Sequence, residues 1–195
     1  LLDLIVFGKA AGDHITETVR GSSSNYKPLP KHVLVQSMNR VNTLQQSTTG
    51  ENAQDVADEI RRVMQQHAGV FRTQASMDEG VRKIMALESR VKNIHLTDKS
   101  QVFNTARIEA LEVENLFEAA KATMISAAAR HECRGAHTVV DYERPENDPE
   151  HPNGRNDVEW MKHTLWYSSD NRLTYKPVRL IPLTVDSIPL ATRTF

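Results

Sequence analysis

The stretch LLDLIVFGKAAG, residues 1–12, decides how the rest of the chain is interpreted. Six large apolar residues precede Gly8, and they would cover nearly every side of a helix. A helix that is hydrophobic all round is stable only when it is buried in a larger body. It is too short to span a membrane, which takes about 20 apolar residues. Since no capping residue precedes it, we expect the chain to be part of a longer protein that buries this helix.

Composition narrows the class of protein. A chain of 195 residues can form one or two domains with a substantial core. The 24 Lys and Arg residues are balanced by 25 Asp and Glu residues, and this balance argues against a nucleic-acid-binding surface. Cys133 is the single cysteine, so the chain cannot form an internal disulfide, as is usual in a reducing compartment.

The centre of the sequence predicts a helical bundle. Residues 31–144 contain no proline, which permits long helices. Apolar residues recur at helical spacing within four segments, which we predict as helices: 32–46, 53–68, 71–94 and 104–130. A stripe close to a 3.5-residue period favours near-parallel packing. We therefore predict a mainly α fold built on an antiparallel, spectrin-like bundle of three principal helices.

The C-terminal third has a different composition. Residues 141–156 are polar and contain three prolines, as in a surface loop. HTLWYS and RLTYKPV flank Ser-Ser-Asp-Asn and predict a β-hairpin, followed by an extended tail from residue 178. These patterns divide the chain into three parts. They are a buried helix with its connector (1–30), the helical bundle (31–132), and a loop, hairpin and tail (133–195).

The opening stretch also carries a family resemblance. It is similar to the helix after the last flavin-contacting loop of succinate dehydrogenase and fumarate reductase flavoprotein subunits, where the pattern is NRLGxNSLLDLxVFGRxA. Lys9 stands where that pattern has Arg. FNTARIEALEVENLFEAA (103–120), RGAH (134–137), WMKHTLWY (160–167) and the final RTF resemble further motifs of the family. The resemblance spans the whole chain and implies that this is the family's C-terminal part.

The resemblance implies a function for the parent protein. That protein would oxidise succinate to fumarate, or catalyse the reverse, using FAD, and would pass electrons to an iron–sulfur subunit and on to quinone. It would lie peripherally on the cytoplasmic face of a bacterial inner membrane, or on the mitochondrial matrix side, and contact membrane anchor subunits indirectly. No catalytic residue falls in this chain. We expect the chain to complete and brace the flavin site against the FAD-binding and capping domains, and to be inactive alone.

Leu1 and Leu2 are the candidate cofactor-binding residues. The N-terminus of a helix presents unpaired N–H groups and a partial positive charge, which can stabilise an anion. The resemblance implies that the anion is the reduced flavin and that the backbone of Leu1 contacts it; Leu2 is the weaker candidate. Without the resemblance, an ordinary core helix is the simpler interpretation.

Arg134 and His137 are candidate domain-contact residues. A cationic Arg and an imidazole beside a glycine turn could bind a carboxylate or fix a contact between domains. We favour the second role, with both residues pinning the bundle to the flavin domain. The family pattern RGAHxRxD has a second Arg where this chain has Val139, although Asp141 is kept. A role that needs both arginines is therefore in doubt.

Other sites and functions are weaker candidates. His131, Cys133 and His137 lie close in sequence, but no second ligand pair completes a zinc site, and no base can be assigned to activate Cys133. A stand-alone helical interaction module remains an alternative, and it would bury residues 1–7 against its own core; a domain of a larger protein would leave them exposed. Fumarate reductase and L-aspartate oxidase are the related alternatives, and the sequence does not decide the direction of the reaction.

Overall fold

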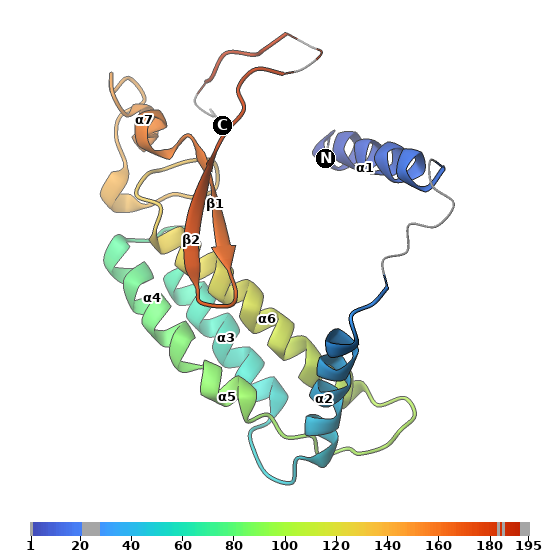
Figure 1. Cartoon of the computed structure of the whole chain (residues 1–195). Helices are drawn as coiled ribbons and strands as arrows, with labels where there is room; N and C mark the ends of the chain where they lie inside the picture. Colours follow the sequence, from blue (N-terminus) through green and yellow to red (C-terminus); the bar gives the residue numbers. More distant parts are fainter. Residues whose placement is uncertain (1, 21–27, 183, 185, 192–195) are drawn as a thin grey trace. The chain divides into compact units, whose positions relative to one another are not determined.

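The computed structural model describes residues 2–20, 28–182, 184 and 186–191 and is mainly helical, as predicted. The helices are α1 Leu2–Arg20, α2 Lys31–Gln46, α3 Ala53–His67, α4 Gln74–Ala86, α5 Glu88–Lys92, α6 Thr105–Ala128 and α7 Asp157–Trp160 (Figure 1). Two 3-10 turns cover Val140–Tyr142 and Pro152–Gly154, and the strands are β1 Lys162–Tyr167 and β2 Arg172–Pro177. The chain divides into two compact units, residues 1–40 and 41–195.

In the first unit, α1 confirms the predicted opening helix. Its apolar side chains are exposed: Leu2, Leu4, Ile5, Val6 and Phe7 are each between 59% and 76% exposed. Burial of this helix in a flavin domain stays a prediction. Residues 21–27, most of the predicted connector, lie outside the described residues. No helix in the described part of the chain is long and apolar enough to cross a membrane.

In the second unit, α3, α4 with α5, and α6 pack side by side as a three-helix bundle (Figure 1). Their apolar stripes meet in the core, where Val56, Ile60, Ile84 and Met124 are completely buried. Close packing at the centre depends on Gly80. A Cβ added there would lie 2.6 Å from the His67 Cβ and 2.7 Å from the Met124 sulfur, so any side chain would force its neighbours to shift. The predicted three-helix bundle is confirmed.

The predicted helix 71–94 is wrong at both its start and its middle. The helix begins at Gln74 because the Thr73 hydroxyl accepts a hydrogen bond from the Ser76 N–H (3.2 Å) and caps it. It breaks at Leu87, whose N–H bonds to the Ile84 carbonyl (3.1 Å), a tighter spacing than in an α-helix. Two helices, α4 and α5, therefore replace the single one.

The β-hairpin is confirmed. β1 and β2 are antiparallel, with Thr164 opposite Tyr175, and residues 168–171 form the turn. Asn171 has a left-handed backbone (φ 56°), which Asn tolerates better than most residues. The hairpin lies along α6, where the buried Lys121 ammonium stands 5.8 Å from the Trp166 ring centre. This contact fixes the hairpin on the bundle and positions the start of β1 near the end of α6.

Candidate functional site

Of the two predicted flavin-contacting residues, the structure describes Leu2 at the N-terminus of α1. Leu1 lies outside the described residues. Leu2 is the first residue of α1, and its side chain is 76% exposed. The N–H groups of a first helical turn have no partner within the helix. A contact between this turn and a flavin stays a prediction.

The structure brings Arg134 and His137 together in a tight turn. The Arg134 N–H donates to the His137 carbonyl (2.8 Å), and the His137 N–H donates to the Arg134 carbonyl (3.0 Å). Gly135 between them has φ 59°, a left-handed conformation that glycine adopts without strain. The sequence RGAH therefore specifies a turn in which the backbones of Arg134 and His137 lie opposite one another.

Glu132 organises this turn, and the sequence reasoning missed it. Its side chain is fully buried and accepts hydrogen bonds from Arg130 (2.6 Å), from Arg134 (2.8 and 3.0 Å) and from the Asn156 N–H (2.9 Å). Arg134 also pairs with Asp157 (2.6 Å). A buried carboxylate is retained only when its lone pairs are satisfied, and here they are. The sequence signal that could have identified Glu132 is its position two residues from an Arg on each side, Arg130 and Arg134.

His137 is held by the end of α6. Its Nε2 lies 2.9 Å from the Arg130 carbonyl, so this nitrogen donates and Nδ1 is the free acceptor. Burial, reinforced by the positive charges of Arg72 and Arg130, lowers the pKa of His137 from its ordinary value of 6.5. The imidazole is therefore neutral at pH 7. Arg134 and His137 both have partners inside this chain, and a further contact to a flavin domain stays a prediction.

Val139 and Cys133 belong to a small core beneath the turn. Val139 is completely buried beside Met77 and Ala128. The Cys133 thiol donates to the Val139 carbonyl (3.3 Å), and burial raises the pKa of this thiol. A protonated, buried thiol is a poor nucleophile. Within the described residues, no three His, Cys, Asp or Glu side chains are grouped so that they could hold a metal ion.

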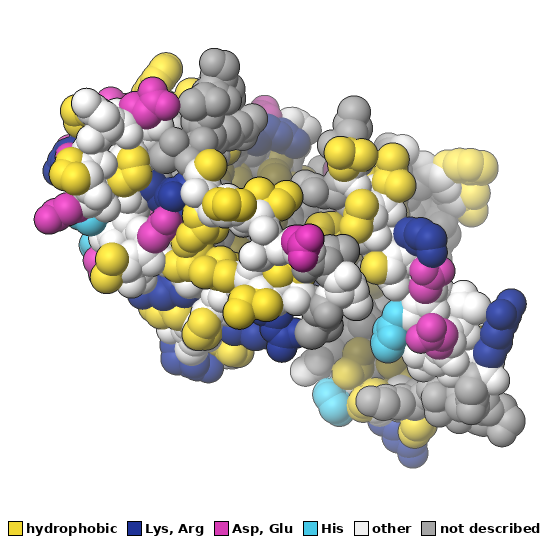
Figure 2. Space-filling model, turned by 90° about the horizontal axis from the view of Figure 1, so that it is seen from above, with side chains coloured by type: hydrophobic (Ala, Val, Ile, Leu, Met, Phe, Trp, Pro, Cys, Tyr) yellow, Lys and Arg dark blue, Asp and Glu magenta, His cyan; other side chains and the backbone are white. Residues whose placement is uncertain are grey.

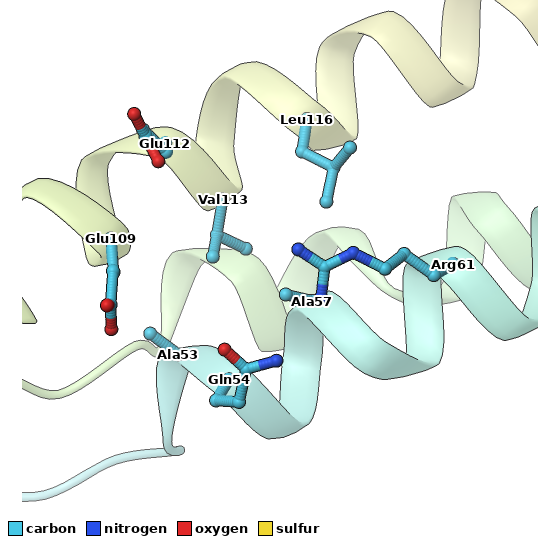
Figure 3. A pocket seen from close by; sticks show the side chains of 8 residues that line it. All are labelled: Ala53, Gln54, Ala57, Arg61, Glu109, Glu112, Val113 and Leu116. Carbon is cyan, nitrogen blue, oxygen red and sulfur yellow. The ribbon is translucent and has the colours of Figure 1, made fainter.

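A hollow also lies between α3 and α6, away from the Arg134–His137 turn (Figure 3). Its volume is about 280 Å³, and the small side chains of Ala53 and Ala57 leave the space. Glu109 and Glu112 extend from α6 and are exposed. Arg61 on the opposite side pairs with its own helix neighbour Asp58 (2.8 Å). The described residues that line this hollow include no nucleophile paired with a base.

Comparisons with known proteins agree with this architecture. A family model described as "Fumarate reductase flavoprotein C-term" matches residues 57–195. The chain belongs to the succinate dehydrogenase and fumarate reductase flavoprotein family. It is 40% identical to the succinate dehydrogenase flavoprotein subunit of Rickettsia bellii, with all of this chain and 32% of that protein covered. It is 33% identical to the fumarate reductase flavoprotein subunit of Haemophilus influenzae, with 92% of this chain and 29% of that protein covered.

Solved structures show the same fold. Escherichia coli quinol fumarate reductase matches with a TM-score of 0.77 and 29% identity, covering 95% of this chain and 31% of that one. The chain thus spans about a third of the length of the relatives it matches, and it corresponds to their C-terminal part. The family recognised from the LLDL, FNT and RGAH motifs is confirmed.

Proposed function

We propose that this C-terminal domain belongs to a flavoprotein that oxidises succinate to fumarate with FAD. The observation that carries the proposal is the match along the whole chain to the C-terminal part of a succinate dehydrogenase flavoprotein subunit. A fumarate reductase flavoprotein subunit matches at 33% identity, so fumarate reduction is the alternative direction for the same parent protein. The parent would pass its electrons to an iron–sulfur subunit and would lie peripherally at a membrane through anchor subunits.

Within that protein, we propose that this chain completes the flavin site and braces its domain. The N-terminus of α1 fits the proposed contact because its unpaired N–H groups and partial positive charge suit an anionic edge of the flavin. When bound, the flavin supplies hydride acceptance and electron transfer. The contribution of this chain is the backbone at Leu1 and Leu2, with Arg134 and His137 as proposed contacts to the flavin domain.

The comparisons support the domain interpretation over a stand-alone interaction module, because the whole chain matches one part of a longer relative. Within its own unit, α1 leaves Ile5 and Phe7 69% and 70% exposed. An exposed apolar surface of this kind marks a place where another part of a protein packs. We propose that the FAD-binding domain of the same subunit covers it.

A turnover assay tests the division of labour. The purified chain is incubated with FAD, succinate and an electron-accepting dye, and dye reduction is followed by absorbance. We expect no turnover, because the side chains grouped around the Arg134–His137 turn bind one another and hold no succinate-oxidising arrangement. The full flavoprotein subunit, assayed in parallel, should reduce the dye. Turnover by the chain alone would refute the proposal that it only braces the site.

A further inference from the structure

An open cavity of about 540 Å³ lies where three segments of the second unit meet. They are the C-terminal end of α6, the Arg134–His137 turn and the first half of β1, a strand that contacts α6. We call it the Lys162 cavity, after the lysine at its wall. Its lining combines cationic side chains, Arg130, Arg134 and Lys162, with apolar surface.

The cations around the cavity differ in how they are neutralised. Arg130 and Arg134 share the buried carboxylate of Glu132, and Arg134 also pairs with Asp157. Lys162 forms no ion pair with any carboxylate of the described residues. Its half-buried ammonium stands 4.4 Å from the ring centre of Trp160 and 4.3 Å from that of Tyr175. A cation that lies over two aromatic faces and has no carboxylate partner keeps its charge available for an anion.

The wall beside Lys162 is held firmly. The Arg130 guanidinium donates to the carbonyl of Trp160 (3.1 Å) and to that of Lys162 (2.6 Å), which ties the start of β1 to the end of α6. Trp160 is 4% exposed, and its indole N–H has no acceptor among the described residues. A fixed wall lowers the entropic cost of binding, because little has to be ordered when a ligand arrives.

We propose that the Lys162 cavity binds a carboxylate group. The Lys162 ammonium is the charge partner, and the remaining wall, which includes Met161 and Val178, accommodates a short hydrocarbon chain. Apolar lining with a few polar groups is typical of sites for small organic ligands. The apolar part of this wall favours an organic acid, whose hydrocarbon chain can cover it, over inorganic phosphate, which has none. The proposal needs neither flavin nor succinate oxidation.

The carboxylate has two possible sources, and both share this chemistry. One is a small free acid, for which propionate is the probe. The other is a Glu side chain of a protein segment. Its probe is N-acetyl-glutamic acid α-amide, in which the side-chain carboxylate is the only free acid. Each probe is titrated into the full chain at constant ionic strength, set with sodium chloride. Tighter binding of the blocked glutamate assigns the site to a protein side chain, and tighter binding of propionate assigns it to a free acid.

The readout is the indole N–H signal in ¹H–¹⁵N NMR spectra. The chain has two tryptophans, so Trp160 and Trp166 give two indole signals, and Trp166 serves as the internal reference. We expect a saturable shift of the Trp160 signal. Lys162→Gln should weaken binding about tenfold, the usual effect of losing one charged hydrogen bond. Lys162→Met, which keeps a long stem over the rings, is the second variant without the charge.

Lys176→Gln is the matched control, because Lys176 lies on the neighbouring strand opposite His163 and does not line the cavity. It should bind as the unaltered chain does, and Lys162→Arg should retain binding. A Trp160 shift that does not saturate would overturn the proposal. The proposal would also be overturned if Lys162→Gln and Lys162→Met bound the probe as tightly as the unaltered chain does, or if inorganic phosphate bound as tightly as propionate.

Discussion

Replacing Glu132 by Gln tests whether one buried carboxylate holds the loop region on the bundle. The Glu132 side chain is fully buried, and its two oxygens accept four hydrogen bonds from Arg130, Arg134 and the Asn156 backbone. Gln keeps the shape but loses the charge, and its amide N–H₂ would face a guanidinium. Glu132→Gln therefore leaves two partly buried cations sharing less negative charge.

The structure sets the size of the effect. Removing one partner of a buried ion pair typically costs about 3 to 5 kcal/mol. The lower end applies here, because Arg134 keeps Asp157 and Arg130 keeps the carbonyls of Trp160 and Lys162. We expect a loss of about 3 kcal/mol in the free energy of unfolding. In a domain of this size that lowers Tm by about 6 to 12 °C.

Urea unfolding followed by near-ultraviolet circular dichroism measures this loss, since Trp160 lies beside Arg130. The control is Asp58→Asn, which removes the partner of Arg61 in a pair on α3 whose side chains are both more than half exposed. Exposed pairs contribute at most about 1 kcal/mol. If Glu132→Gln costs no more than the control, the reasoning that Glu132 organises this region is refuted.

Three further results are expected. Gly80→Ala should lower the free energy of unfolding, measured with urea, by about 1 to 3 kcal/mol. The reason is that the new Cβ would lie 2.6 Å from the His67 Cβ and 2.7 Å from the Met124 sulfur. Unchanged stability would contradict this packing. Since burial lowers the pKa of His137 below 6.5, the unfolded chain binds the proton more readily, and the unfolding free energy should fall as pH drops below 6.5. His137→Gln should lack this part of the pH dependence, so parallel curves for both proteins from pH 7.5 to 5.5 would contradict it. Burial shields the Cys133 thiol and raises its pKa. Iodoacetamide at pH 8 should therefore alkylate this thiol about tenfold more slowly in the native chain than in urea. Equal alkylation rates would contradict the burial of Cys133.

Local pattern predicted much of the fold. The apolar stripe through Val56 and Ile60 predicted α3 because a helix repeats its buried face every three to four residues. The hairpin followed from β-forming residues around a polar turn. The break at Leu87 was missed because its flanking residues keep the apolar stripe in phase through the change in hydrogen bonding.

The site was harder to predict than the fold. The motif RGAH marked Arg134 and His137, but their partners depend on tertiary structure. Glu132 is buried because Asn156 and Arg134 approach it from different segments, and no local pattern distinguishes it from an exposed acid. The Lys162 cavity likewise joins residues more than 30 positions apart in sequence. On the face seen in Figure 2, acidic and basic side chains are scattered among hydrophobic ones, so charge alone marks no site there.

The central claim is that this chain is the C-terminal domain of a larger flavoprotein. Intact mass spectrometry of the protein purified from the cells that encode it, combined with its visible absorbance spectrum, tests this claim most directly. The account predicts a polypeptide about three times as long, since the relatives are covered to 29–32%, that contains this sequence and carries a flavin. A flavin-free product that begins at Leu1, or a few residues before it, would contradict the account.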